Sequence, residues 1–478
     1  MNIISDNALR NKSETSFKIL FFVYLMLGTC NLTYGKPIVS VVMYVTFSFG
    51  GVIILWRLLS VKKFIKSYGL IWVLLLLVSY AFSTLTNMQY FNKQSIVVFV
   101  LWCFYFLILF LNDPERKRET AEKELHLIFG MYLAYVTLLV IISCGMLITG
   151  YGMSYRDPNN NNYEVVSGFF FGRLWGAFQD PNLGSVMCCI SVVISGYFMW
   201  FFKKKIVTVL LSLDIAVMVF YIALSDSRNG MVTAGCVLGF TLFFYLFRKY
   251  HDEHGKKAVF KKTVSMLAVA VVAFAGAALP KVVQKGYNAF IVSQEGNKNT
   301  EDPTDTDTKL NQFVVNRGYD IKENVSNNRF AIWETGINIA LDKPLTGVSF
   351  NGLLPYAKEN YPDSYMVSNG LWEFNTLDND YLNVFVSQGL PGILIVLILA
   401  ATCVVKIFRN VWTVDRKYFP TVLVCTVMVC SLVVSAMFQG TMFYQQTPNT
   451  ALFWLFLGYL CLMLSANDGC KAQIKEEI

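Results

Sequence analysis

Residues 376–408 read TLDNDYLNVFVSQG and then LPGILIVLILAATCVVKIF. The first part is polar at its start and ends at Gly389. The second part is an almost continuous apolar run, long enough to cross a bilayer as a helix. This stretch closes the one large hydrophilic block of a sequence that is otherwise largely apolar. It predicts a helical membrane protein whose chemistry takes place at the membrane face where this block lies.

The composition of the whole chain agrees with this reading. Of the 478 residues, 55% are hydrophobic and 15% are charged, and the mean hydropathy is +0.47. Soluble domains carry roughly 25% charged residues. The apolar residues form runs of membrane-crossing length, which predict an all-α polytopic membrane protein with about twelve transmembrane helices. The expected spans are roughly 17–34, 37–59, 69–87, 95–112, 125–149, 182–202, 206–224, 230–247, 263–283, 390–408, 421–439 and 450–466.

The distribution of basic residues predicts the orientation of these spans. Most of the 40 Lys and Arg residues fall in alternate loops, and the short loops between them hold few. Because basic loops stay on the cytoplasmic side, both termini are expected in the cytoplasm. The formal charge of +8 is then mainly a topology signal and does not indicate nucleic-acid binding.

The expected topology divides the chain into three parts. Residues 1–283 carry transmembrane helices 1–9 and an outer loop at 150–181, residues 284–389 form a large extracytoplasmic loop with short helices, and residues 390–478 carry helices 10–12 and a cytoplasmic tail. Within the large loop, the polar segment 294–312 is expected to be a mobile tip.

Two helices are expected in the rest of the large loop. One runs from Arg329, after an Asn cap, to about Leu341. The other runs from near Thr376 to Gly389, and it is too short and too polar to span, so we expect it along the membrane surface. Asp378 would then lie in its first turn, where the helix dipole favours an ionised carboxylate.

The sequence does not point to a metal or a disulfide framework on the outer side. The large loop contains no Cys, and the three His residues lie in or beside the expected cytoplasmic loops. Asp378 and Asp380 form an acidic pair, but neighbours two apart on a helix do not face one another. No metal and no cofactor are therefore expected.

Three outer-side arginines stand in segments that look ordered. Arg173 lies in FGRLWGAFQDPN (171–182), Arg228 lies in SDSRNG (225–230), and Arg329 opens the loop helix. The planar guanidinium binds phosphate oxygens in bidentate fashion, so together the three would suit a lipid-linked diphosphate. Taken singly, each has a simpler interpretation: snorkelling to the interface, an ion pair of Arg228 with Asp226, or a solvated charge at Arg329.

The segment Asp378-Asn379-x9-Gly389-x-x-Gly392 resembles the His-Asn-x9-Gly-x-x-Gly signature of the O-antigen ligase and Wzy-type polysaccharide polymerase family. Three further segments resemble parts of this family in the same order, and the resemblance covers roughly residues 165–440. They are Gly172-Arg173 with Gly176 and Asp180-Pro181-Asn182, then Leu224-Ser225-x-Ser227-Arg228, then Arg329-x3-Trp333 followed by Pro344 and Gly347.

The resemblance implies glycan transfer on the outer face of a bacterial cytoplasmic membrane, from an oligosaccharide carried on undecaprenyl diphosphate. The implied partners are this donor, the growing polysaccharide, membrane lipid and a chain-length regulator protein. The arginines would hold the diphosphate, and the residue at the first signature position would activate the acceptor hydroxyl. The expected catalytic residues are Asp378, Arg329, Arg228 and Arg173, and the expected substrate-binding residues are Asn379, Trp333, Tyr381 and Asn182.

The sequence departs from the ligase signature because Asp378 replaces its His. This departure favours the polymerase branch, in which an Asp can act as the general base. A ligase that transfers finished glycan to another acceptor and a flippase of lipid-linked oligosaccharide remain the alternatives. Trp333 and Tyr381 would stack on sugars or, in the simpler interpretation, pack the loop against the membrane helices.

Overall fold

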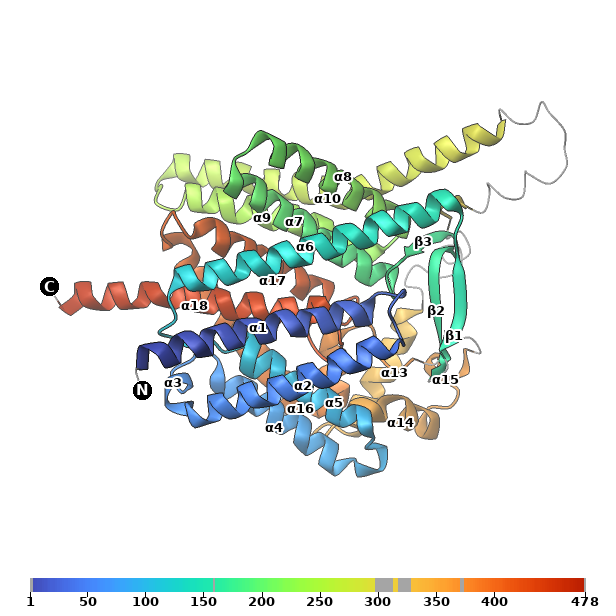
Figure 1. Cartoon of the computed structure of the whole chain (residues 1–478), viewed down its shortest axis with the longest axis horizontal. Coiled ribbons are helices and arrows are strands. Elements are labelled where there is room, and N and C mark those ends of the chain that lie inside the picture. Colours follow the sequence, from blue (N-terminus) through green and yellow to red (C-terminus); the bar gives the residue numbers. More distant parts are fainter. Residues whose placement is uncertain (1–2, 158–159, 297–312, 317–327, 370–373, 477–478) are drawn as a thin grey trace. The chain divides into compact units, whose positions relative to one another are not determined.

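The computed structural model describes residues 3–157, 160–296, 313–316, 328–369 and 374–476 (Figure 1). The part of the expected polar tip from 297 to 312 lies outside the described residues. The chain forms two compact units, which we describe separately. Unit 1 comprises residues 1–28, 36–126 and 326–478, and unit 2 comprises residues 29–35 and 127–325.

Unit 1 is built almost entirely from helices. Its elements are α1 (Ile3–Thr29), α2 (Pro37–Leu59), α3 (Val61–Phe64), α4 (Leu70–Thr86), η1 (Met88–Tyr90), α5 (Lys93–Cys103), the π-helix η2 (Phe104–Phe110), the start of α6 (Arg118–Thr149), α13 (Arg329–Asp342), η4 (Phe350–Gly352), α14 (Leu353–Asn360), α15 (Tyr365–Ser368), α16 (Asp380–Asn410), η5 (Val411–Thr413), α17 (Phe419–Ser435) and α18 (Pro448–Glu476).

Unit 2 combines four long helices and the rest of α6 with a small sheet. Its further elements are β1 (Met153–Asp157), β2 (Asn160–Phe170), β3 (Arg173–Gly176), α7 (Pro181–Phe202), α8 (Lys205–Ser225), α9 (Arg228–Lys249) and α10 (Lys256–Gly296). The strands form an antiparallel sheet in the order β1-β2-β3. This sheet lies within residues 150–181, the segment expected as an outer loop, in which the sequence had not indicated strands.

The helices agree with a helical membrane protein. Nine helices of the described residues are long and apolar enough to cross a membrane, and α4 and α17 are shorter apolar helices. Each of the twelve predicted spans overlaps one of the helices. Which of these helices cross a membrane stays a prediction.

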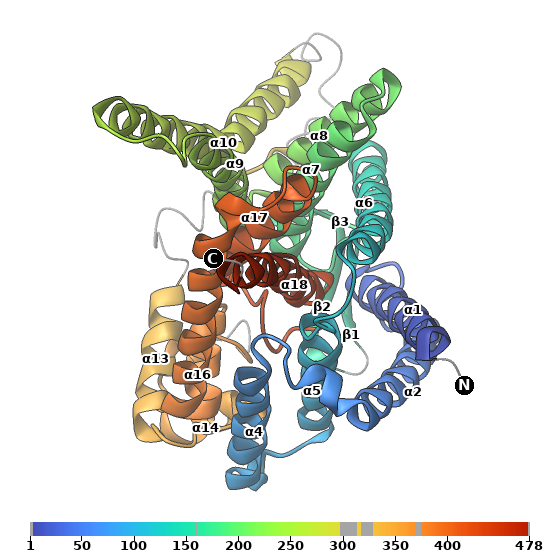
Figure 2. The ribbon, with the colours of Figure 1, turned by 90° about the vertical axis from the view of Figure 1, so that its left-hand side faces the viewer.

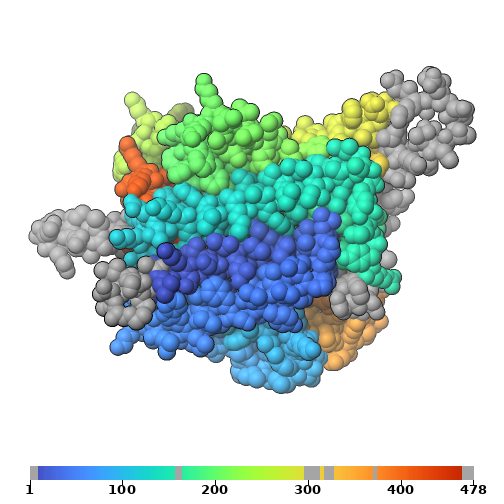
Figure 3. Space-filling model, in the orientation of Figure 1, coloured from blue at the N-terminus to red at the C-terminus, as the bar shows by residue number. Residues whose placement is uncertain are grey.

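Helix α18 is the centre of unit 1. It packs against η2, α16 and α17 (Figure 2), and its side chains from Ala451 to Leu464 are almost all buried. Trp454 lies 4.6 Å from Phe106 and 5.6 Å from Phe443, measured between ring centroids. Helices α1 and α2 lie side by side on one face of the unit (Figure 3) through contacts such as Phe17 with Phe49.

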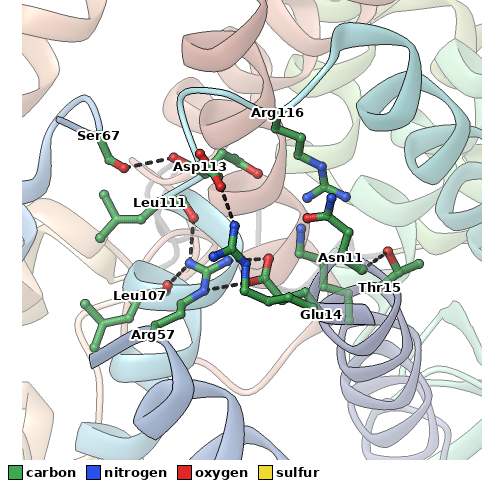
Figure 4. Close-up of polar contacts among 12 residues, drawn as sticks. Asn11, Glu14, Thr15, Arg57, Ser67, Leu107, Leu111, Asp113 and Arg116 are labelled. Carbon is green, nitrogen blue, oxygen red and sulfur yellow. Dashed lines mark hydrogen bonds and ion pairs between the residues drawn. The ribbon is translucent and has the colours of Figure 1, made fainter. Parts of the chain in front are cut away.

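A buried group of charges holds α1 against α2 and α6 (Figure 4). Arg57 donates to both carboxylate oxygens of Glu14, at 2.9 and 2.7 Å, and to the carbonyl oxygens of Leu107 and Leu111. Both side chains are less than 10% exposed. The bidentate geometry and the extra carbonyl acceptors offset the cost of burying these charges.

The same group extends along α1. Arg10 forms an ion pair with Asp113. The Lys18 Nζ lies 2.9 Å from Glu124 Oε1 and donates to Tyr459 Oη at 3.0 Å. Residues distant in the sequence thus satisfy charges that α1 could not bury alone.

The described residues between 328 and 389, which belong to the expected large loop, have a hydrophobic core of their own. The loop helix expected from Arg329 is present as α13, and it packs against α14, α15 and α16. Asp342 at its end accepts hydrogen bonds from the hydroxyls of Tyr361 (2.7 Å) and Tyr356 (3.2 Å). The buried core residues are Ile332, Ile339, Ala340, Val348, Leu353, Ala357, Met366, Leu377 and Val386. These residues therefore form a packed loop core against α16.

Helix α16 is broken at Gly389, where the sequence analysis expected the surface helix to end. Gly389 has φ 67° and ψ −163°, a conformation that is essentially restricted to glycine. A Cβ there would lie 2.5 Å from the carbonyl oxygen of Pro344, which also accepts the Leu390 N–H at 2.7 Å. The turn after α13 thus fixes the break between the part of α16 before Gly389 and the apolar part after it.

The expected start of the surface helix is wrong. The helix begins at Asp380, not near Thr376, because the Asn379 side chain caps it. Asp378 precedes the cap in a left-handed conformation with φ 49°, so it is not in the first helical turn. Leu377 likewise lies outside the helix and is buried in the loop core.

Candidate functional site

Unit 1 brings Asp378 and Arg329 together. The Asp378 Oδ2 lies 3.7 Å from the Arg329 Nη2, and the two side chains are 48% and 25% exposed. Trp333, one turn further along α13, donates from its Nε1 to the Leu377 carbonyl oxygen at 2.8 Å. Helix α13 therefore supplies a cation for Asp378 and fixes the residue before it.

Asn379 and Tyr381 act in the structure as anchors for the start of α16. The Asn379 Oδ1 accepts from the backbone N–H groups of Tyr381 and Leu382 at 3.0 and 3.1 Å. The Tyr381 hydroxyl donates to the Val433 carbonyl oxygen at 2.8 Å. Asn383 adds a further support by accepting the Leu377 N–H at 3.0 Å. These bonds fix the backbone on both sides of Asp378. Its own carboxylate stays half exposed.

Asp380 has a role that the sequence analysis missed. Its side chain is fully buried, and its Oδ2 accepts the N–H groups of Thr441 and Met442, both at 2.7 Å. Its own N–H donates to the Ala436 carbonyl oxygen. Asp380 thus joins α16 to the segment after α17, and its partners differ from those of Asp378. Across the described residues, no group of three or more His, Cys, Asp or Glu side chains is placed to hold a metal.

In unit 2, Arg173 and Asn182 come together. Arg173 begins β3, and its Nη2 donates to the Asn182 Oδ1 at 3.2 Å. The guanidinium also lies over the Trp175 ring, 5.7 Å from its centroid. Asp180 caps α7 by accepting the N–H groups of Asn182 and Leu183 at 2.6 and 3.0 Å. Arg173 is thereby fixed at the N-terminal end of α7.

The turn that carries Arg228 packs against this end of α7. Ser227 caps α9 by accepting the Gly230 N–H at 3.0 Å, and Arg228 is the first residue of the helix. The Ser185 hydroxyl lies 2.6 Å from that of Ser225. A Cβ on Gly230 would come within 2.4 Å of the Ser185 Cβ. The starts of α7 and α9 are therefore in close contact, so Arg173, Asn182 and Arg228 lie at one end of unit 2.

A fourth polar group at this end was not selected from the sequence. Lys281 of α10 lies with its Nζ 2.6 Å from the Asp226 Oδ1, and Asp226 belongs to the same turn as Arg228. Asp226 has φ 47°, a conformation that Asp tolerates better than most residues. The sequence places Lys281 within an apolar run, far from the turn along the chain, and so gives no sign of this pair.

The structure therefore groups the predicted residues in two sets. Unit 1 holds Arg329 beside Asp378 and Trp333 on the Leu377 carbonyl oxygen, with Asn379 and Tyr381 fixing the start of α16. Unit 2 holds the arginine–asparagine pair beside the turn of Arg228. Each set combines a guanidinium with oxygen or amide groups, which suits phosphate and sugar hydroxyls.

Comparison with known proteins agrees with the sequence motifs. Residues 213–397 match the model of the family Wzy_C, described as O-antigen ligase. The matched range contains Arg228, Arg329 and Asp378, so the prediction of the family is confirmed. An uncharacterised protein of Haemophilus influenzae is 23% identical over 347 residues, which are 67% of this chain and 74% of that protein.

Proposed function

Residues 213–397 of this chain belong to the O-antigen ligase family, and from this premise we propose that the protein is a membrane enzyme that transfers a lipid-linked glycan. The donor is an oligosaccharide on undecaprenyl diphosphate, and the reaction takes place on the outer face of a bacterial cytoplasmic membrane. The observation that carries the proposal is the contact between Asp378 and Arg329 at the start of the family's signature segment.

In the proposed reaction, a hydroxyl of the acceptor glycan attacks the anomeric carbon of the donor. The new glycosidic C–O bond forms while the bond from the anomeric carbon to the diphosphate oxygen breaks. The acceptor proton passes to the Asp378 carboxylate, which acts as a general base. The electron pair of the broken bond leaves on the diphosphate.

The arginines stabilise the leaving diphosphate. In this proposal Arg173, Arg228 and Arg329 supply the positive charge that offsets the negative charge developing on the diphosphate, a kind of contribution that is often the largest in catalysis. Arg329 also lies beside the Asp378 carboxylate, with 3.7 Å between Nη2 and Oδ2, and orients it toward the acceptor. Asn182, in the unit 2 set, supplies an amide for the glycan. Trp333, in the unit 1 set, supplies an aromatic face.

We favour polymerisation over ligation because the residue at the head of the signature is Asp378. In this reading the acceptor is the non-reducing end of a second lipid-linked repeat unit, and the product is a capsular, exo- or O-antigen polysaccharide. A chain-length regulator would be a partner of such a polymerase. The ligase alternative uses the same donor and the same leaving group but delivers the glycan to a different acceptor.

Product length after deletion of the gene distinguishes the candidate functions. Loss of a polymerase leaves single repeat units on the acceptor, whereas loss of a ligase leaves long chains on the lipid diphosphate. Loss of a flippase would leave single lipid-linked units on the inner face of the membrane. We expect single lipid-linked units on the outer face. Long lipid-linked chains would contradict the polymerase assignment but would leave the proposed donor unchanged.

A further inference from the structure

Lys281 is an unassigned cation at the end of unit 2 that carries Arg228. Its Nζ lies 2.6 Å from the Asp226 Oδ1 and donates to the Gln284 Oε1 at 2.7 Å. The Lys281 side chain is 45% exposed, whereas that of Asp226 is 8% exposed. The buried partner therefore fixes the position of the ammonium group while the group still faces outward.

Close packing between α9 and α10 keeps Lys281 in this place. A Cβ on Gly235 of α9 would lie 2.6 Å from the Ala273 carbonyl oxygen of α10, and one on Gly276 would lie 3.2 Å from the Ala234 carbonyl oxygen. Small residues at such positions let two helix backbones approach closely. The contact lies one to two turns before Lys281, so this part of α10 moves little relative to α9.

The lysine retains hydrogen-bonding capacity. An ammonium group has three N–H donors, and Asp226 and Gln284 take two of them. Asp226 and Arg228 are two residues apart, so their Cα atoms are separated by at most about 7 Å. The remaining N–H of Lys281 is thus presented beside the turn that starts α9 with Arg228.

Resting on the proposed function, we propose that Lys281 is a further cation for the diphosphate, at the end of unit 2 that carries Arg173 and Arg228. Its remaining N–H donates to a phosphate oxygen of the lipid-linked donor, and Asp226 and Gln284 are positioning residues that hold the ammonium group. Lys281 forms no covalent bond in the reaction. Its charge adds to those of Arg173 and Arg228 and offsets the negative charge that the departing diphosphate gains.

An apolar hollow of about 660 Å³ on unit 2 supports a lipid-linked ligand over a free phosphate. Helices α6, α8 and α10 line it with side chains that include Ile148, Phe220, Tyr287 and Phe290. Helix α10, which also carries Lys281, contributes Val283 and Ile291 to the lining as well. A lipid diphosphate carries its apolar chain directly on the phosphate, so an apolar hollow lined by the helix that carries the cation matches that part of the donor.

Binding of a short lipid diphosphate tests the role of Lys281 without requiring turnover. The full chain is placed in phosphatidylcholine nanodiscs, and the affinities for farnesyl diphosphate, farnesyl monophosphate and inorganic pyrophosphate are measured. We expect Lys281→Met to weaken farnesyl diphosphate binding about tenfold, Lys281→Arg to retain most of the affinity, and the monophosphate to respond less. Farnesyl diphosphate should bind more tightly than pyrophosphate.

Two further variants show whether Lys281 binds the diphosphate or only stabilises the fold. Lys285→Met removes an exposed lysine one turn along the same helix and should change nothing. Asp226→Asn keeps an oxygen acceptor for Lys281 but removes the opposing charge that positions the ammonium group, so diphosphate binding should weaken, by less than in Lys281→Met. Lys281→Gln, which keeps an N–H donor and a similar stem, replaces the Met variant if that variant has a lowered thermal unfolding midpoint.

Several results would overturn the inference. Wild-type affinity in Lys281→Met or Lys281→Gln would remove Lys281 from the site. Equal losses of farnesyl diphosphate affinity in Asp226→Asn and Lys281→Met would show that the pair only stabilises the fold. If Lys281→Met changed only the response to added phosphatidylglycerol, the lysine would bind a bilayer headgroup. If the wild-type protein bound no diphosphate at all, the proposed function itself would fail, which is a distinguishable outcome.

Discussion

At the scale of single residues, the geometry of Asp378 depends on its neighbours more than on its own side chain. Asn379 caps α16, Trp333 holds the Leu377 carbonyl oxygen, and Asp380 is buried. Of the three polar residues in Asp378-Asn379-Asp380, two are used to fix the backbone. The remaining carboxylate is half exposed beside a guanidinium, which is the arrangement expected of a general base that meets a substrate.

Asp378→Asn tests this arrangement. The amide keeps the shape but cannot accept the acceptor proton, so transfer should fall about 100-fold or more, measured with purified protein and lipid-linked donor. The unfolding midpoint should stay the same, because a partly exposed ion pair adds little stability. Asp363→Asn, at an exposed position of the same loop, is the matched control and should retain wild-type activity. A fully active Asp378→Asn variant would show that another group takes the proton.

The sequence predicted which residues matter here but not how they are held. Asp378 was expected in the first turn of a helix that starts near Thr376, but Asp378, Asn379 and Asp380 all have side chains that can cap a helix. The choice among them depends on contacts from distant segments. Asp380 is fixed by N–H groups some 60 residues later in the chain, and Lys281 meets Asp226 across 55 residues. Motif spacing carries no information about such pairs.

At the scale of elements, local patterns were enough at two boundaries, although the Asn328 side chain before α13 makes no capping hydrogen bond. Helix α13 begins at Arg329 and the surface segment of α16 ends at Gly389, as expected from the sequence. The sheet of residues 153–176 was missed because its support is not local. The Asn31 side chain donates to the carbonyl oxygens of Val166 and Phe178, at 2.5 and 2.8 Å, and a residue from another segment cannot be inferred from the strand sequence.

Gly389→Ala tests the break in α16. The backbone conformation is strained for any residue with a Cβ, at a cost of roughly 1–3 kcal/mol, and the new atom would clash with the Pro344 carbonyl oxygen. We expect a lower thermal unfolding midpoint and weaker transfer, because the segment that carries Asp378 loses its fixed junction with the apolar segment. Gly196→Ala in α7, where a Cβ would meet nothing within 4 Å, should leave the midpoint unchanged or raised. Equal midpoints for the two variants would contradict the strained break.

At the scale of the whole molecule, the buried charges of unit 1 connect segments that are far apart in the sequence. Removing one partner of a buried ion pair leaves the other charge uncompensated, which costs about 3–5 kcal/mol. Arg57→Met should therefore lower the unfolding midpoint strongly, and adding Glu14→Gln should restore part of the loss. Lys417→Met, which breaks the exposed pair with Glu119, should have no measurable effect. A midpoint for Arg57→Met that matched this control would contradict the importance of the buried group.

This arrangement also has a consequence for the biogenesis of the protein. The ribosome releases α1 before the segments that carry its partners. Arg10 and Lys18 are then already on α1, whereas Asp113 and Glu124 are made about one hundred residues later. Until then these two cations remain hydrated, because a bilayer offers them no partner. We therefore expect that α1 reaches its buried position only after the segment up to residue 124 has left the ribosome, so that this helix settles later than its place in the sequence suggests.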